Sequence, residues 1–336
     1  MVAINDFNSD GILDLVVLNS GENTVGVLLG VGSGRFGSQT TFPTGLTPFS
    51  IAVGDFNGDG RLDLAVVNYG DNTMSVLLGT GRGSFRPQII YSTGFYPCRI
   101  VVGDLNGDGR LDLIVANFYS SNVGVLLGIS NGYFAPQTTY PTIANPSFVA
   151  INDFNGDAYL DLVVISSYWP TISVLLGTGT GTFQLQTTFS TNSGSYVIAT
   201  GDFNSDDQVD IVVGNGYPWL PNLGVLLGNG NGSFGLPMMF SVGFDVVLNW
   251  ITIGDLNGDG RLDLVVSSSY TSADNIRVLI GTGNGSFVLQ PPLATEPNSA
   301  PYGIAISDLN NDGRLDLAFC DSTAENVLGI FLNTCT

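Results

Sequence analysis

The sequence of 336 residues contains no histidine and no lysine, and its only basic side chains are nine arginines against 29 acidic residues. Nucleic acids and anionic membranes are bound through basic patches, so a formal charge of −20 excludes both classes of partner. Histidine and lysine are also the most frequent general bases and Schiff-base residues. We therefore expect no enzyme, no nucleic-acid partner and no membrane insertion.

Cysteine is also scarce, with only Cys98, Cys320 and Cys335. An odd and sparse set of cysteines is not a disulfide framework, so we expect buried or free thiols, with a Cys320–Cys335 bridge as the alternative. No apolar run approaches the ~20 residues of a membrane-spanning helix, and no signal peptide is visible. Low charge (11%) together with 45 glycines favours short strands and tight turns over helices.

An internal repeat defines the architecture. The pattern D-x-N-x-D-x-x-x-D begins seven times, at intervals of 49 residues and later 53: at Asp6, Asp55, Asp104, Asp153, Asp202, Asp255 and Asp308. The repeats start near residues 1, 50, 99, 148, 197, 250 and 303. Each holds four short apolar segments separated by turns, with no helical periodicity. This predicts one all-β domain over 1–336, a seven-bladed β-propeller of four-stranded blades, with a linear solenoid as the alternative.

The last repeat ends after its third apolar segment, near 328–332, and too few residues follow for an outer strand. We therefore expect the last blade to have three strands, or to be completed by a strand from outside these residues. An uncovered sheet edge favours association with other chains.

The acidic loop has the ligand chemistry of calcium, which takes six to eight oxygen ligands. Side chains at positions 1, 3, 5 and 9 and the backbone carbonyl of position 7 would provide them, and position 6 should be Gly. We predict up to seven structural Ca²⁺ sites: Asp6, Asn8, Asp10, Ile12, Asp14; Asp55, Asn57, Asp59, Arg61, Asp63; Asp104, Asn106, Asp108, Arg110, Asp112; Asp153, Asn155, Asp157, Tyr159, Asp161; Asp202, Asn204, Asp206, Gln208, Asp210; Asp255, Asn257, Asp259, Arg261, Asp263; and Asp308, Asn310, Asp312, Arg314, Asp316.

These loops account for 21 of the 29 acidic residues, and carboxylates crowded into one turn repel each other unless a cation lies between them. The alternative is a set of Asx-rich turns without metal. Mg²⁺ prefers rigid octahedral sites, and zinc would require His or clustered Cys. Two loops lack Gly at position 6, where Ala158 and Asp207 stand. Because Ala tolerates positive φ less well than Asp, we expect the Asp153–Asp161 site to be the weakest or most distorted.

The repeats resemble the FG-GAP/VCBS repeat family, known from the integrin α-subunit head. The resemblance rests on the acidic loop and on a Gly-rich segment that ends in Phe, such as Gly79–Phe85 (GTGRGSF) and Gly281–Phe287 (GTGNGSF). It implies a seven-bladed propeller whose acidic loop joins strands one and two, and calcium-stabilised interaction outside the cell, often adhesive. Some fungal lectins are similar propellers, but their sugar-pocket motifs are not recognisable here. An extracellular or cell-surface location follows as an expectation.

A partner would bind the face opposite the calcium loops, because all length variation between repeats can be placed there. Aromatic residues occur in the two-to-three turns on that face, with candidate contacts at Tyr119, Tyr168, Trp169, Tyr217, Trp219 and Tyr270. Phe118 lies in the same turns, and Phe95, Tyr96, Trp250 and Tyr302 lie near the blade links. Aromatic-rich loops on a rigid scaffold suit protein contacts or sugar stacking. The alternative is that these rings cap the core between blades.

Three functions compete. The leading hypothesis is a calcium-stabilised, non-catalytic protein-interaction or adhesion module with a protein or glycan ligand. The first alternative is a carbohydrate-binding, lectin-like propeller. The second is a glycosidase or lyase that uses carboxylates alone, although the acidic residues outside the loops show no pairing pattern. No sequence feature specifies an oligomeric state.

Overall fold

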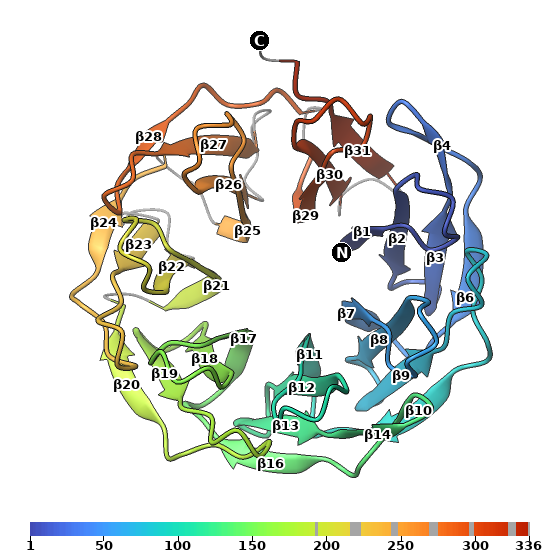
Figure 1. Cartoon of the computed structure of the whole chain (residues 1–336), viewed down its shortest axis with the longest axis horizontal. Helices are drawn as coiled ribbons and strands as arrows, with labels where there is room; N and C mark the ends of the chain where they lie inside the picture. Colours follow the sequence, from blue (N-terminus) through green and yellow to red (C-terminus); the bar gives the residue numbers. More distant parts are fainter. Residues whose placement is uncertain are drawn as a thin grey trace.

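The computed structural model describes residues 1–191, 194–215, 223–242, 248–268, 275–295, 299–321 and 327–334. Seven antiparallel sheets are arranged around a central axis, each with its first strand innermost (Figure 1). We number these blades one to seven in chain order. The predicted all-β seven-bladed propeller is thereby confirmed. No helix in the described ranges is long and apolar enough to cross a bilayer.

The strands of each blade are given from the axis outward. Blade one contains β1 (Val2–Asn5), β2 (Asp14–Asn19), β3 (Thr24–Leu28) and β6 (Thr40–Pro43); blade two contains β7 (Pro48–Gly54), β8 (Asp63–Asn68), β9 (Thr73–Leu77) and β10 (Ile89–Ser92); blade three contains β11 (Pro97–Gly103), β12 (Asp112–Asn117), β13 (Asn122–Leu126) and β16 (Thr138–Pro141); blade four contains β17 (Pro146–Asn152), β18 (Asp161–Ser166), β19 (Thr171–Leu175) and β20 (Thr187–Ser190). Blade five contains β21 (Ser195–Gly201), β22 (Asp210–Asn215), β23 (Leu223–Leu226) and β24 (Met238–Phe240); blade six contains β25 (Leu248–Gly254), β26 (Asp263–Ser268), β27 (Ile276–Gly281) and β28 (Phe287–Leu289); blade seven contains β29 (Pro301–Ser307), β30 (Asp316–Asp321) and β31 (Val327–Phe331).

The turns between the third and fourth strands of blades one and three form short hairpins that were not expected from the sequence. These are β4 (Gly30–Gly32) with β5 (Arg35–Phe36), and β14 (Gly128–Ser130) with β15 (Tyr133–Phe134). At the same place, blades two, four and five have single bridges, such as Gly79↔Phe85. These turns share the Gly-rich motif that ends in Phe.

The second strand of each blade is almost continuously apolar because neighbouring blades pack on both of its faces. All six residues of β8 are buried, as predicted for the segment that follows the acidic loop. Each core cluster spans two adjacent blades. The cluster between blades one and two, for example, joins Val16 and Val25 to Leu64 and Val66. The core is therefore a ring of blade junctions.

An edge-to-face pair of rings recurs at five of these junctions. The fourth strand of one blade contributes Phe or Tyr, and the Gly-rich turn of the next blade contributes the Phe that ends the motif. Phe42 meets Phe85 with 5.3 Å between ring centroids and 86° between planes. The others are Tyr91 with Phe134, Tyr140 with Phe183, Phe189 with Phe234, and Phe240 with Phe287. Such pairs add to the stabilisation from burial alone.

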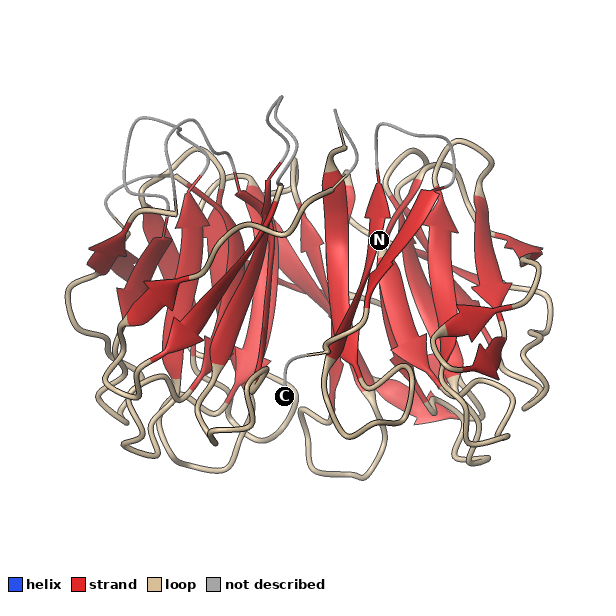
Figure 2. Ribbon diagram, turned by 90° about the horizontal axis from the view of Figure 1, so that it is seen from above, coloured by secondary structure: helices blue, strands red, loops and turns tan. Residues whose placement is uncertain are grey.

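The turns fall on two faces of the disc, seen from the side in Figure 2. The acidic loops and the three-to-four turns share one face, since the Gly83 N–H donates to the Phe7 carbonyl of the preceding blade at 3.0 Å. We call this the loop face, and the face with the two-to-three turns and the blade links the variable face. Among the described residues, blade seven has three strands, with β31 outermost, as expected.

Candidate functional site

In each acidic loop, the first Asp fixes the turn by accepting hydrogen bonds from its backbone. In blade two, Asp55 Oδ1 accepts from the Gly58 N–H at 2.8 Å, and Oδ2 accepts from the Gly60 N–H at 2.7 Å. The bond from the N–H of position 6 to the first Asp occurs in all seven loops. The Asp at position 1 therefore determines the loop conformation in every repeat.

The last Asp of the loop is buried and joins the loop to its blade. Asp63 is fully buried; its Oδ2 accepts from the Phe56 N–H at 2.9 Å, and its Oδ1 accepts from the Gly79 N–H at 2.6 Å, at the end of the third strand. The same two bonds recur in the other six loops, with Asn333 in the place of the Gly in blade seven.

The pKa of Asp63 is raised to about 6, mainly by burial. The carboxylates of Asp55 and Asp59 also raise this pKa, whereas the two backbone hydrogen bonds lower it. The pKa of Asp161 also rises to about 6, mainly through burial. The pKa values of Asp14, Asp112, Asp210 and Asp263 are raised for the same first cause. A buried carboxyl with two carboxylate neighbours is a group that a cation would stabilise.

The donor set of each loop fits Ca²⁺ because it consists of oxygen atoms, from three carboxylates, one amide and one carbonyl. The carboxylates share one turn but stand apart: in the described ranges, no three His, Cys, Asp or Glu side chains lie close enough to form a ready-made metal cluster. In loop one, the Asn8 amide donates to Asp10 Oδ2 at 2.9 Å. Four loops also have an Arg at position 7 whose side chain pairs with the position-5 Asp at the surface.

The fourth loop, expected to be distorted, has the same hydrogen bonds as the others. Ala158 takes φ = 66° and donates its N–H to Asp153 Oδ2 at 2.7 Å. Asp207 takes φ = 63° in loop five. The replacement of Gly by Ala at position 6 therefore leaves the loop geometry unchanged. Its effect is backbone strain, since an Ala in the left-handed region costs ~1 kcal/mol. Position 4 also has positive φ, at Ser9 and Ser205 for example, which the sequence reading missed.

Aromatic rings on the variable face form one continuous series across blades two to four. We call this series the aromatic arc: Phe49, Tyr69, Tyr96, Phe118, Tyr119 and Tyr168. Ring centroids are 4.7 Å apart between Tyr69 and Tyr96, and again between Tyr96 and Tyr119. Tyr119 and Tyr168 are 61% and 64% exposed, and Trp169 beside them is 55% exposed. Tyr69 and Phe118 are half-buried and pack against the core, whereas the other four rings of the arc are exposed to solvent.

The other predicted contacts divide into two groups. Tyr217, Trp219 and Tyr270 lie outside the described residues. Trp250 was expected among the exposed aromatics, but this was wrong: its side chain is 9% exposed. It lies on inner strand β25 and packs near the axis against Phe148 and Tyr302. The alternative that rings cap the core holds for Trp250, and also for Phe118, which is half-buried against the core between blades three and four. The sequence reading also missed Phe49 and Tyr69 as members of the arc.

Arg99 is a buried cation in the same axial cluster, and it was not predicted. Its guanidinium lies over the rings of Phe148 and Trp250, and burial lowers its pKa. Arg99, Phe148 and Trp250 pair with Ala116, Ile165 and Ser267, which are equivalent positions of three blades. The repeat register therefore provides the signal that could have found this cluster, because equivalent residues of inner strands meet at the axis.

Comparison with known proteins identifies the family. The chain belongs to the FG-GAP-like repeat family, whose repeat matches residues 6–66, 55–115, 104–164, 153–213 and 255–319. No curated protein sequence matches it.

Several solved structures share the fold at low identity. An Agrocybe aegerita lectin that recognises non-reducing terminal N-acetylglucosamine is 19% identical, with a TM-score of 0.64 over 99% of this chain and 94% of the lectin. BBS1N, solved in complex with ARL6DN, is 13% identical with a TM-score of 0.67 over 98% and 90% of the two chains. Virginiamycin B lyase from Staphylococcus aureus is 14% identical, with a TM-score of 0.63 over 96% of each chain. At these identities the likeness concerns the fold alone.

Proposed function

We propose that this protein is a calcium-stabilised, non-catalytic propeller that binds an extracellular protein partner through the aromatic arc. The observation that carries the proposal is the continuity of the arc: six rings from three blades contact one another on one face. Interface hot spots are enriched in Tyr and Trp, and they lie on surfaces held rigid by the scaffold. The location outside the cell rests on calcium, which is abundant there.

Calcium would be held by the side chains of positions 1, 3, 5 and 9 and the carbonyl of position 7 in each loop. Its contribution would be electrostatic and structural, since it would neutralise the carboxylates that the loop brings together. The buried Asp of position 9 would carry this effect into the blade, because the same carboxylate bonds to the end of the third strand. The arc would then be displayed on a scaffold whose loops on the opposite face are each stabilised by a bound metal ion.

A carbohydrate ligand is the second candidate. Tyr168 and Trp169 are adjacent exposed rings, and aromatic faces stack on sugars as well as on protein side chains. A lectin with this fold recognises N-acetylglucosamine. The protein partner is favoured because the rings of the arc contact one another across three blades, which makes an extended surface and not a single stacking platform.

The test compares arc variants with a matched aromatic elsewhere. Tyr119→Ala and the double variant Tyr168→Ala with Trp169→Ala are assayed against extracellular proteins displayed on an array and against a glycan array. Tyr133→Ala is the control, because Tyr133 is 52% exposed but lies in a hairpin of the loop face. We expect loss of protein binding in the arc variants alone. Binding that free sugar abolishes would establish the lectin function, and binding unchanged by the arc variants would refute the proposed surface.

A further inference from the structure

The Gly-rich turns of blades five and six contain a sequence pattern that the proposed function does not use. Asn231–Ser233 and Asn284–Ser286 both read Asn-Gly-Ser. Asn-x-Ser is an acceptor pattern for N-linked glycans and is expected in surface loops of secreted proteins. Asn-x-Ser or Asn-x-Thr, with x other than Pro, occurs nowhere else in the sequence. Both copies lie at the same place in the repeat, in neighbouring blades.

The Gly-rich motif does not itself require Asn at this place. Ser33, Arg82 and Thr180 occupy the equivalent position in blades one, two and four. These residue types share little chemistry, so the turn tolerates different side chains at its tip. The Asn of blades five and six is therefore not fixed by the fold of the turn.

Each of the two Asn residues lies at the tip of a closed turn on the loop face. In blade five, the Asn229 N–H donates to the Ser233 carbonyl at 3.0 Å, which closes the turn around Asn231. An equivalent bond closes the turn around Asn284 in blade six. Both side chains are exposed to solvent. The acceptor residues thus lie where an oligosaccharide can extend away from the protein.

The middle Gly of each pattern fixes the turn to the preceding blade. The Gly232 N–H donates to the Phe154 carbonyl at 2.9 Å, and the Gly285 N–H donates to the Phe203 carbonyl at 2.9 Å. Both Gly residues have positive φ, at 77° and 79°, which favours Gly over other residues. The Asn side chains are therefore presented by a backbone that is bonded to the scaffold.

The hydrogen bonds of the two carboxamides leave the nitrogen available. Asn231 Oδ1 accepts from the Ser233 N–H at 3.0 Å and from the Ser233 hydroxyl at 2.7 Å. Asn284 Oδ1 accepts from the N–H and the hydroxyl of Ser286. Because a backbone N–H can only donate, the atom that faces it must be the oxygen. Neither Nδ2 has a hydrogen bond to a residue that the structure describes, and Nδ2 is the atom that a glycan would modify.

Blade three provides a matched turn that lacks the acceptor pattern. Asn131 is exposed at the equivalent tip and is followed by Gly132, but Tyr133 stands where blades five and six have Ser. The turn thus presents an Asn in the same place without the hydroxyl that the pattern requires. It is an internal control for the effect of that hydroxyl.

We propose that Asn231 and Asn284 carry N-linked glycans, so that two oligosaccharides stand on neighbouring blades of the loop face. The inference rests on the extracellular location proposed above, because this modification occurs on secreted chains. The donor is an oligosaccharide linked to a lipid pyrophosphate. The bond from its anomeric carbon to the pyrophosphate oxygen breaks, a bond from that carbon to Nδ2 forms, and Nδ2 loses one proton. The carboxamide stays neutral, and its Oδ1 keeps the bonds to Ser.

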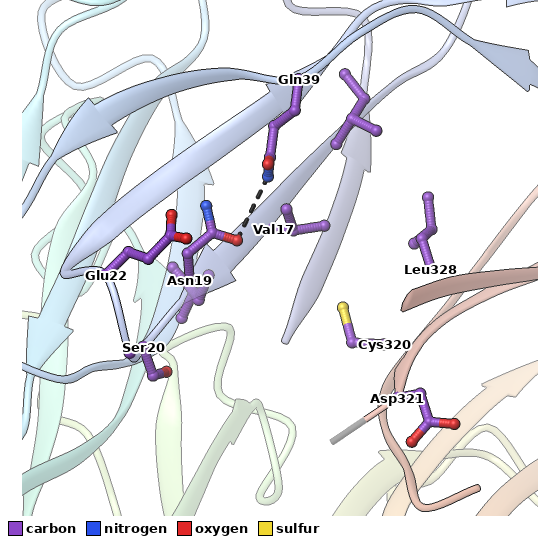
Figure 3. Close-up of a pocket in the computed structure, with 11 residues that line it drawn as sticks. Val17, Asn19, Ser20, Glu22, Gln39, Cys320, Asp321 and Leu328 are labelled. Atoms are coloured by element: carbon purple, nitrogen blue, oxygen red, sulfur yellow. Dashed lines mark hydrogen bonds between the residues drawn. The ribbon is translucent and has the colours of Figure 1, made fainter. Parts of the chain in front are cut away.

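Glycans at these positions would leave the variable face uncovered. The aromatic arc lies on that face. Figure 3 shows a cavity of about 500 Å³ between blades seven and one, which is lined by Ser20 and Glu22 of a two-to-three turn. The lining of this cavity contains no residue of a Gly-rich turn. Modification of the loop face is therefore compatible with partner binding on the other side.

The test expresses the chain behind a cleavable secretory signal in human cells and treats medium and cell extract with peptide N-glycosidase F. Release in heavy-oxygen water labels each former acceptor as Asp, which peptide mass spectrometry locates. We expect the label at Asn231 and Asn284 and not at Asn131. Asn231→Gln and Ser233→Ala should each remove one step of the gel shift, although the second variant retains the Asn. Tyr133→Ser should add a step.

A secreted protein without label at Asn231 and Asn284 would overturn the inference, and so would label at Asn231 that persists in the Ser233→Ala variant. A circular dichroism spectrum like that of the parent protein verifies that each variant is folded. The enzymatically deglycosylated protein should bind the partner of the aromatic arc as the glycosylated protein does. Absence of glycans would therefore leave the arc proposal intact, and absence of arc binding would leave the glycan sites intact.

Discussion

The guanidinium carbon of Arg99 lies 3.8 Å from the centroid of the Phe148 ring, so a buried cation is held by an aromatic face near the axis. The Trp250 ring is 4.6 Å away from the same carbon. The ion pairs formed by the described residues do not include Arg99. The charge is therefore stabilised by the two ring faces, by packing of its long stem and by the Tyr302 side chain, which favours the charged form.

Replacing Arg99 by Ala should lower the free energy of unfolding by ~2–4 kcal/mol. The variant loses both ring contacts and leaves a cavity at the axis. Arg99→Met should cost less, because it retains most of the packing. Urea denaturation followed by tryptophan fluorescence measures both. Arg86→Ala, at an exposed position, is the control. Equal stability of the Arg99→Ala and Arg86→Ala variants would show that the cluster contributes nothing.

Removal of calcium should lower the melting temperature. A site saturated 100-fold above its Kd contributes up to about 2.7 kcal/mol, and contributions from linked sites do not simply add. Asp63→Asn should remove part of this stabilisation in calcium, because Asp63 connects its loop to the third strand. Glu22→Gln removes one exposed carboxylate outside the loops and should have no effect. A melting temperature unchanged by EGTA would contradict the calcium proposal.

In chelator, acidification should first stabilise the protein. Asp63 and Asp161 have pKa values of about 6 in the folded state against 3.8 as the ordinary value, so folding favours their protonated forms. Their contribution to stability is fully present below pH 3.8 and is lost as the pH rises through about 6. We expect a higher melting temperature in EGTA at pH 5 than at pH 7.5. In calcium the trend should reverse, because protons compete with the metal. The same sign in both conditions would refute this account.

The cysteines should differ in reactivity. Cys98 is buried, donates its Sγ–H to the Pro146 carbonyl at 3.3 Å, and has a pKa raised to about 12 by burial. Cys320 is half-buried beside the cavity between blades seven and one. In the native Cys335→Ser protein at pH 8, iodoacetamide should modify Cys320 and leave Cys98 intact, as read by peptide mass spectrometry. In urea both should react; modification of native Cys98 at the rate of Cys320 would show that its strand opens.

Ala158→Gly should stabilise the protein by ~1 kcal/mol and tighten calcium binding at the fourth loop, because it relieves the positive φ of Ala158. Gly60→Ala is the reciprocal control. A Cβ at Gly60 would meet nothing within 4 Å, so only the backbone cost at φ = 77° should appear, with the opposite sign. Thermal melts in calcium and in EGTA measure both variants. A neutral Ala158→Gly variant together with a costly Gly60→Ala would mean that loop four relaxes.

The repeat made most of the fold predictable, because spacing and periodicity are properties of one blade. The burial of β8 and the three-stranded last blade follow from the local pattern. Residues whose environment depends on several blades were harder to predict. Trp250 reads as an exposed aromatic near a link, yet its register places it at the axis with Arg99. Tyr69 and Tyr96 become neighbours only when adjacent blades bring their loops together.

The edge-to-face ring pair has a consequence for engineering. Blades two, three, four and five each present the motif Phe to the preceding blade and a Phe or Tyr to the following one. These blades have the same pair of aromatic contacts at their two sides. One of them could therefore replace another with both ring pairs preserved. In blade six, Leu293 occupies the position of the fourth-strand Phe or Tyr. Blade six could therefore not replace another blade without a substitution at this position.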